Sequence, residues 1–163
     1  MKIYVDFDGV IKDTDKVLDL EYSKVDNISR SDFVKNYDWD KLLEVSDIIN
    51  NSLDYLKNTK YDVYILSKIS SMNEGIAKVK YLRESGVNIN IHLVPTKISK
   101  SDMVSAKGNI LIDDKVYNLD EWVDKGGIGI FFNKDNLDYD VRGNENTKYK
   151  KINSLDILYN DIA

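Results

Sequence analysis

Met1-Lys-Ile-Tyr-Val-Asp-Phe-Asp-Gly-Val-Ile11 is the stretch that decides the fold of this chain. It opens with a short run of apolar, β-prone residues, and we expect residues 2–6 to form a buried strand. Asp6 would then lie at the carboxyl end of that strand, where open parallel α/β sheets bind their ligands. Gly9 lets the backbone turn sharply there, close to whatever the carboxylates of Asp6 and Asp8 hold. Two acids so placed suit Mg²⁺, although a simple polar turn uses the same residue types.

The composition indicates one soluble globular domain covering residues 1–163. Hydrophobic residues make up 42% of the chain, and no apolar run approaches the roughly 20 residues of a membrane span. The formal net charge of -5 argues against a general binder of nucleic-acid polymers or of membrane surfaces. The absence of cysteine excludes disulfides and thiolate sites, and the single His92 excludes a histidine-cluster metal site. No signal-peptide pattern follows Met1, so a cytoplasmic location is expected.

After the opening strand, apolar β-like runs alternate with helical stretches. Further strands are expected at residues 61–66, 88–94, 109–112 and 127–132. Helices are expected at residues 41–57, 74–85 and 116–125, and the chain would close with a strand or extended piece at 149–152 and a helix at 155–162. Within residues 74–85, the apolar Ile76, Val79 and Leu82 share one helical face. The alternation predicts an α/β fold, a Rossmann-like parallel sheet of about five strands with helices on both faces.

Residues 12–40 interrupt this alternation. The segment is polar, has no long apolar run, and carries short helical patterns around Leu18 and Phe33. We expect it to form a small helical cap inserted after the first strand. Its aromatic residues are unusually many for so polar a segment: Tyr22, Phe33, Tyr37 and Trp39.

Polar side chains follow four of the expected strands at the point where each strand ends. They are Asp6 and Asp8, Ser67, Lys97 and Lys100, and Asp113 and Asp114. Each has an ordinary structural explanation by itself, but the carboxyl ends of parallel strands open on one edge of a sheet, so the groups can converge. Acids, a hydroxyl, a cation and Mg²⁺ together suit phosphoryl transfer, where catalysis is mainly positioning and electrostatic stabilisation. A carboxylate nucleophile can carry the phosphoryl group, while a second acid protonates the leaving oxygen and then activates water.

These residues resemble the motifs of the haloacid dehalogenase (HAD) superfamily of Mg²⁺-dependent phosphotransferases. Asp6-Phe7-Asp8-Gly9-Val10 is similar to the family's D-x-D-G-[TV] first motif, and Ile112-Asp113-Asp114 to its acidic fourth motif. Ser67 matches the second motif, and a lysine before the next strand matches the third. The resemblance covers residues 2–132. The short insertion, the segment 65–67, and residues 110–114 followed by Trp122 look most like the 5′(3′)-deoxyribonucleotidase group.

The resemblance implies roles for the four acids. Asp6 would be the nucleophile, with its other oxygen on Mg²⁺, the implied cofactor. Asp8 would be the general acid and base, with its backbone carbonyl on the metal. Asp113 would bind Mg²⁺, and Asp114 would be a second ligand or hold a metal-bound water.

Two further residues would hold the phosphoryl group in the same resemblance. Ser67 would hydrogen-bond a phosphoryl oxygen. Lys100 would neutralise the phosphoryl charge and orient the nucleophile. We choose Lys100 over Lys97 because its distance along the chain from Asp113 is nearer the family's usual spacing.

The implied substrate is a small-molecule phosphate monoester, and the cap suggests a nucleotide. The four cap aromatics could form the cap's own small core, but so short a helical segment cannot bury all of them, and one or two should face the cleft. A base stacked on an aromatic ring gains roughly 1–3 kcal/mol. We therefore expect a (deoxy)ribonucleoside monophosphate as substrate, with Phe33 and Trp39 as its substrate-binding residues.

Other functions are consistent with parts of the pattern. A HAD phosphatase could act on another small phosphate ester, and a non-catalytic protein of the same fold could bind a phosphorylated ligand. A signalling receiver domain uses similar residues, but its acidic pair follows the first strand and its phospho-accepting aspartate the third, which is not the order here. Residues 126–129 precede a strand and so do not form a dinucleotide-binding loop. Residues 136–140 lack the pattern of a calcium loop and are better explained as a solvated loop.

Overall fold

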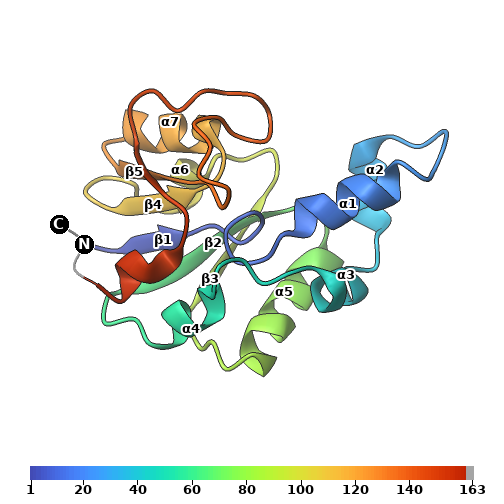
Figure 1. Cartoon of the computed structure of the whole chain (residues 1–163), viewed down its shortest axis with the longest axis horizontal. Coiled ribbons are helices and arrows are strands. Elements are labelled where there is room, and N and C mark those ends of the chain that lie inside the picture. The colour runs from blue at the N-terminus through green and yellow to red at the C-terminus, as the bar shows by residue number, and fades with distance from the viewer. Residues whose placement is uncertain (161–163) are drawn as a thin grey trace.

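A sheet of six parallel strands forms the centre of the protein, in the order β3-β2-β1-β4-β5-β6 (Figure 1). The computed structural model describes residues 1–160. Its strands are β1 (Ile3–Val5), β2 (Val63–Ile69), β3 (Ile91–Pro95), β4 (Ile110–Asp113), β5 (Ile128–Phe132) and β6 (Lys150–Ile152). The predicted α/β class and parallel sheet are confirmed. The sheet has six strands against the predicted number of about five, because the closing segment at 149–152 pairs with β5.

The central strand β1 is buried on both faces. Ile3 pairs with Val63 of β2 on one side and with Ile110 of β4 on the other. Ile3 belongs to the core beneath one face of the sheet, whereas Tyr4 packs edge-on against Trp122 on the other face, with 5.4 Å between the ring centroids. Burial on both faces explains why this strand is apolar at every position instead of alternating.

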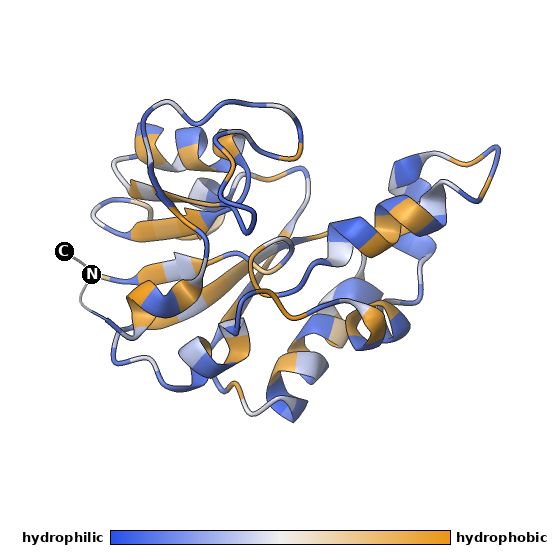
Figure 2. Cartoon of the chain, viewed as in Figure 1, coloured by the Kyte–Doolittle hydropathy of each residue, from blue (hydrophilic) through white to orange (hydrophobic). Residues whose placement is uncertain are grey.

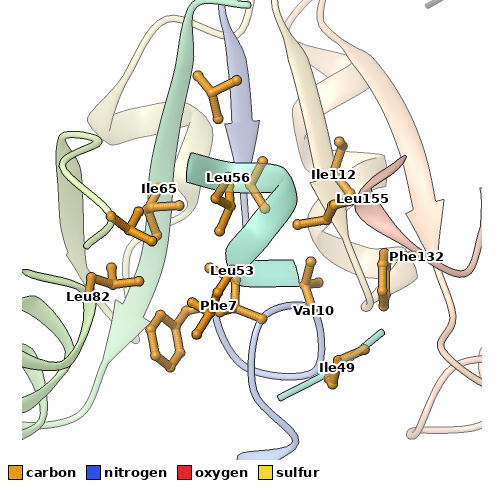
Figure 3. Packing of buried hydrophobic residues seen from close by; sticks show 14 of the residues in the cluster. Phe7, Val10, Ile49, Leu53, Leu56, Ile65, Leu82, Ile112, Phe132 and Leu155 are labelled. Atoms are coloured by element: carbon orange, nitrogen blue, oxygen red, sulfur yellow. The ribbon is translucent and has the colours of Figure 1, made fainter. Parts of the chain in front are cut away.

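Helices cover both faces of the sheet (Figure 1). One face carries α4 (Ser52–Lys57), α5 (Met72–Glu84) and the 3₁₀ helix η1 (Leu155–Leu158), and the other carries α6 (Lys100–Met103) and α7 (Val116–Asp124). Apolar residues concentrate in the strands and on the helical faces that meet them (Figure 2). Leu56 of α4 lies over the sheet between Ile65 and Ile112, and Leu53 lies beside Phe7 (Figure 3). Full burial of such a side chain contributes about 1.5–3 kcal/mol to folding. No helix within residues 1–160 is long and apolar enough to cross a membrane.

The single helix predicted over residues 41–57 is wrong. The segment forms two helices, α3 (Trp39–Val45) and α4, with a break between them. Asn50 and Asn51 in the break have positive φ angles of 41° and 61°, a left-handed conformation that asparagine tolerates better than most residues. The prediction of one helix failed because Ile49 has the apolar spacing of a helix but reaches the core from the break itself.

The break brings the chain back to the opening motif. The N–H of Ile49 donates to the carbonyl of Ile11 at 3.0 Å, and Ser52 Oγ donates to the same carbonyl at 2.9 Å. The N–H of Asp13 donates in turn to the carbonyl of Asp47 at 2.9 Å. The turn that follows β1 is therefore fixed from both sides, by β4 and by the break after α3.

Three other boundaries differ from the prediction. β2 continues to Ile69, paired with Pro95, so Ser67 lies inside the strand and not after it. β3 begins at Ile91 instead of residue 88. The closing helix expected over 155–162 is a 3₁₀ turn that ends at Leu158, and residues 161–162 lie outside the described residues.

Helices α1 (Thr14–Tyr22) and α2 (Arg30–Asn36) project away from the sheet, at the right of Figure 1. We call these two helices, with the residues that join them, the cap. The rings of Tyr22, Phe33 and Tyr37 pack on one another in it, with 5.3 Å between successive centroids. Helix α3 begins inside the segment 12–40, but it packs on α5 of the main body.

Candidate active site

The carboxyl ends of the strands open into a cavity of about 200 Å³. Asp6 and Asp8 line it from the turn after β1, Lys68 from β2 and Lys100 from the start of α6. Residues of α1, α2, α3, α5 and α7 and of the loops between the elements form the rest of its walls. A larger groove of about 680 Å³ lies between α3 and α5, but none of the predicted catalytic carboxylates lines it. The smaller cavity is therefore the candidate active site.

Lys100 joins two of the carboxylates in this cavity. Its Nζ donates to Asp6 Oδ1 at 2.8 Å and to Asp113 Oδ2 at 2.6 Å, and the lysine is only 2% exposed. Burial alone would lower the pKa of Lys100, but Asp113 and Asp6 outweigh burial and raise it, so the ammonium stays charged. Lys97 is exposed and forms part of a separate outer groove. The structure thus places Lys100, and not Lys97, where a phosphoryl group beside Asp6 would be.

Asp113 and Asp114 differ in what surrounds their oxygens. Asp113 is fully buried, and besides Lys100 it accepts hydrogen bonds from the N–H of Lys115 at 2.9 Å and from Asn118 Nδ2 at 3.2 Å. Asp114 Oδ1 is buried but has no hydrogen-bond partner among the described residues. Burial raises the pKa of Asp114 well above its usual value, and Asp6 and Asp113 add to this although Lys115 opposes it. Asp114 therefore has a buried oxygen that no other described residue satisfies.

The glycine of the opening motif makes room for Asp114. Gly9 has a φ of +79°, and a Cβ built on it would lie 2.0 Å from Asp114 Oδ2. Any larger residue at position 9 would be strained in the backbone and would push the Asp114 carboxylate away. The turn after β1 and the acidic pair after β4 are therefore fitted directly against each other.

The acidic residues fit a divalent cation. One carboxylate oxygen from each of Asp6, Asp113 and Asp114 lies within 4.8 Å of the other two. Hard cations such as Mg²⁺ bind oxygen ligands of this kind, and the unpartnered Asp114 Oδ1 supplies one. Because Lys100, Lys115 and Asn118 already satisfy Asp113, we expect Asp6 and Asp114 to be the direct side-chain ligands.

Asp8 is held by two hydrogen bonds on opposite oxygens. Thr14 Oγ1 donates to Asp8 Oδ1 at 2.6 Å, and Lys78 Nζ donates to Asp8 Oδ2 at 2.7 Å. Lys78 is fully buried and also donates to Glu74 Oε2 at 2.6 Å and to Ser67 Oγ at 3.0 Å. Burial would lower the pKa of Lys78, but Asp8 and Glu74 together raise it. The expected general acid and base is thus fixed by a charged side chain from α5.

Lys78 and Glu74 were not predicted from the sequence. The apolar face assigned to α5 is wrong in part, because Ile76 is 63% exposed while Glu74 and Lys78 point inward. A buried ion pair at positions i and i+4 has the same spacing as a solvated one, so periodicity alone does not reveal it. The available signal was the absence of an apolar residue at position 78, one turn before the buried Leu82.

Of the three other predicted site residues, Trp39 lines the cavity, whereas Ser67 and Phe33 do not. Ser67 Oγ is buried beside Lys78 and donates to the carbonyl of Lys68 at 3.3 Å, and Ser67 is not among the residues that line the cavity. Trp39 lines the cavity with 2% of its surface exposed, and its Nε1 donates to the carbonyl of Val34 at 3.0 Å. Phe33 packs between Tyr22 and Tyr37 and does not line the cavity.

Comparison with known proteins identifies this architecture. The sequence matches no protein-family model, and no curated protein matches it. Solved structures do match. The magnesium-bound HAD-hydrolase YfnB from Bacillus subtilis aligns with a TM-score of 0.62 and 14% identity, over 97% of this chain and 96% of its own. The chain has the fold of the HAD hydrolases.

Two further structures agree with this assignment. A hydrolase from Pseudomonas syringae aligns over the full length of both chains, with a TM-score of 0.60 and 13% identity. The D,D-heptose 1,7-bisphosphate phosphatase from B. bronchiseptica, complexed with magnesium and phosphate, aligns with a TM-score of 0.52 and 14% identity, over 95% of this chain and 94% of its own. At these identities the likeness concerns the fold, and none of the three is described as a deoxyribonucleotidase.

Mg²⁺ is expected to raise the melting temperature of the protein. Asp6, Asp113 and Asp114 repel one another, and a cation that binds only the folded protein stabilises it by about 2.7 kcal/mol at a hundredfold excess over its dissociation constant. For a domain of this size that corresponds to roughly 5–10 °C. Thermal unfolding followed by circular dichroism, with and without MgCl₂, measures the shift.

Sodium chloride at equal ionic strength is the control for screening of the acidic residues. Asp114→Asn should reduce the shift caused by Mg²⁺, because it replaces the oxygen that has no other partner. An identical melting temperature in MgCl₂ and in the sodium control would show that no such cation site exists.

Proposed function

We propose that this protein is a Mg²⁺-dependent phosphatase that hydrolyses small phosphate monoesters through an aspartyl-phosphate on Asp6. The observation that carries the proposal is the bridge from Lys100 Nζ to Asp6 Oδ1 and Asp113 Oδ2, inside a cavity that Asp8 also lines. A buried ammonium beside a carboxylate nucleophile is suited to balance the charge of a phosphoryl group.

In the first half of the reaction, a carboxylate oxygen of Asp6 attacks phosphorus and the ester P–O bond breaks. The leaving alcohol oxygen takes a proton from Asp8. In the second half, the Asp8 carboxylate takes a proton from water, whose oxygen attacks phosphorus and releases inorganic phosphate and free Asp6. Lys100 keeps the nucleophile in place, and Thr14 and Lys78 orient Asp8. Mg²⁺ held by Asp6 and Asp114 would supply further positive charge to the phosphoryl oxygens.

Nucleoside monophosphates are the substrates that we propose within this class. The cavity of about 200 Å³ is small, and residues of both cap helices line it, which favours a small molecule over a polymer. Trp39 offers the substrate an aromatic edge, although its 2% exposure makes that contact small. Phe33 packs in the cap's own aromatic cluster, so its part in binding would require the cap to move.

The test is release of inorganic phosphate from a panel of nucleoside monophosphates, sugar phosphates and p-nitrophenyl phosphate. We expect continuous turnover with MgCl₂ that stops when EDTA is added, and a higher kcat/KM for nucleotides than for sugar phosphates. A clear preference for a sugar phosphate would overturn the nucleotide assignment and leave the phosphatase assignment standing. A single stoichiometric phosphorylation without release would favour a receiver-like protein, and no reaction with any compound would favour a non-catalytic binding protein.

A further inference from the structure

Five basic side chains line the candidate active site, and three of them are already committed to carboxylates. Lys100 is bound by Asp6 and Asp113. Arg30 Nη2 lies 2.6 Å from Asp19 Oδ1. Burial would lower the pKa of Lys115, but the neighbouring carboxylates of Asp114 and Asp15 raise it instead. Two cations remain.

These two cations are Lys68 and Arg142, and within residues 1–160 neither forms an ion pair with a carboxylate. Both lie against the ring of Tyr117, with Lys68 Nζ 5.2 Å and Arg142 Cζ 4.7 Å from its centroid. A cation on an exposed ring gains about 0.5–1 kcal/mol, but two cations on the same ring repel each other. Within the described part of the chain, neither of them therefore has an ion pair like those that hold Lys100 and Arg30.

Lys68 lies among charges of both signs. Partial burial is the main cause that lowers its pKa, Glu121 and Asp113 oppose the shift, and Lys100 and Lys115 add to it by repulsion. An anion bound at this position would relieve that repulsion.

A buried carboxylate holds Arg142 in this place. Asp140 is 2% exposed and accepts hydrogen bonds from the N–H groups of Val116 at 3.0 Å, Arg142 at 2.9 Å and Asn144 at 2.9 Å. Asp140 thereby binds the loop after β5 to the first turn of α7, whose second residue is Tyr117. The loop is consequently a fixed support that presents Arg142 to the cavity.

The same residues also form the wall between two cavities. Lys68, Thr96, Tyr117 and Arg142 line both the active-site cavity and an adjoining groove of about 620 Å³. A substrate whose reacting phosphate lies beside Asp6 can therefore extend past these residues toward the outer groove.

We propose that Lys68, Arg142 and Tyr117 bind a second phosphate group of the substrate, so that the enzyme acts on organic bisphosphates in preference to monophosphates. This inference rests on the proposed phosphatase function and shifts the preferred substrate from a nucleoside monophosphate to a bisphosphate. Two cations without partners match the two negative charges of a phosphate dianion, and the phenol of Tyr117 can donate a hydrogen bond to it. A nucleoside 3′,5′-bisphosphate carries both this second phosphate and the base of the nucleotide proposal.

The first test compares kcat/KM for pairs of substrates that differ by one phosphate. Adenosine 3′,5′-bisphosphate is compared with adenosine 5′-monophosphate, and fructose 1,6-bisphosphate with fructose 6-phosphate. We expect the bisphosphate of at least one pair to be preferred roughly tenfold or more, the range of a charge-assisted hydrogen bond. Lys68→Met and Arg142→Met should each reduce that ratio, mainly through a higher KM for the bisphosphate.

Lys97→Met is the matched control, because Lys97 is an exposed lysine of the outer groove that has no contact with the Tyr117 ring among the described residues. Its bisphosphate-to-monophosphate ratio should equal that of the wild type. If Lys97→Met and Lys68→Met lowered the bisphosphate-to-monophosphate ratio of kcat/KM equally, the proposal would be overturned, since the effect would then reflect general surface charge. Unfolding curves for each variant confirm that the fold is retained.

A binding experiment separates this proposal from the proposed catalysis. Isothermal titration of the wild type with both members of each pair, in MgCl₂, measures affinity whether or not turnover occurs at a detectable rate. The second phosphate site would be supported if the wild type bound the bisphosphate more tightly than the monophosphate and Lys68→Met removed that difference. This result would count even if no phosphate were released. Hydrolysis of monophosphates and bisphosphates with equal kcat/KM, together with equal affinities, would overturn the site and leave the phosphatase standing.

Discussion

Asp6→Asn is expected to reduce steady-state phosphate release by at least about a thousandfold while leaving the fold intact. The substitution removes the attacking oxygen and one negative charge at nearly constant volume. Lys100 keeps Asp113 as a partner, and the asparagine carbonyl can still accept its hydrogen bond, so the buried ammonium is not left unpaired. Phosphate release at saturating substrate and MgCl₂ is the measurement.

Asp26→Asn is the matched control for this variant. Asp26 is exposed in the loop between α1 and α2, and the same change there should leave turnover unaltered. Circular dichroism and the melting temperature should agree among the wild type and both variants. If Asp6→Asn retains more than a trace of turnover, Asp6 is not the nucleophile.

Lys78→Met should lower the free energy of unfolding by about 3–5 kcal/mol, the usual cost of removing one partner from a buried ion pair. Lys78 is fully buried, and its loss leaves the carboxylates of Glu74 and Asp8 facing each other without a cation. The methionine preserves most of the packing against Phe7 and Trp39, whose rings lie 5.1 Å and 4.9 Å from Nζ. Urea unfolding at neutral pH measures the loss.

The loss should also depend on pH. Burial already raises the pKa of Glu74, with Lys78 opposing the rise, so removing the lysine raises that pKa further. A carboxyl group whose pKa is higher in the folded state keeps its proton on folding, and stability falls as pH rises through the interval between its unfolded and folded pKa values. The deficit of Lys78→Met should therefore be smaller at about pH 5 than at about pH 8.

Lys80→Met on the same helix is the control, because Lys80 is exposed and its loss should cost little. Adding Glu74→Gln to Lys78→Met should restore part of the lost stability, since it removes the buried charge that the lysine balanced. A loss of less than about 1 kcal/mol in Lys78→Met would contradict the view that this ion pair supports the position of Asp8.

The sequence predicted the structure where a local residue pattern is typical of one kind of element. The apolar run before Asp6 and the short run before Asp113 were predicted as buried strands of a parallel sheet and are β1 and β4, and such strands deliver their terminal carboxylates to the same edge. The choice of Lys100 over Lys97 depended on family spacing and stays a prediction, and the structure shows only where the two lysines lie. Lys100 lies on the helix that begins directly beside Asp6 and Asp113.

The sequence did not predict the structure where one residue pattern is consistent with two different structures. Glu74 and Lys78 have the spacing of a surface pair, and burial alone turns them into a support for Asp8. Asp140 lies in a segment expected to be a solvated loop, yet its carboxylate is buried against the start of α7. The break between α3 and α4 retains helical apolar spacing because Ile49 reaches the core from a non-helical backbone. These are tertiary contacts, which a local window does not contain.

The position of β1 in the sheet also determines when the site can form during synthesis. Ile3 pairs with Val63 and Ile110, which are 60 and 107 residues further along the chain. Closing loops of that length is entropically costly, so folding that depends on such contacts is slow. Strand β1 leaves the ribosome before β2 and β4, so it must wait for β4 before both of its edges are covered. Until then its unpaired backbone N–H and C=O groups are open to pairing with other chains, a hazard that chaperones counter.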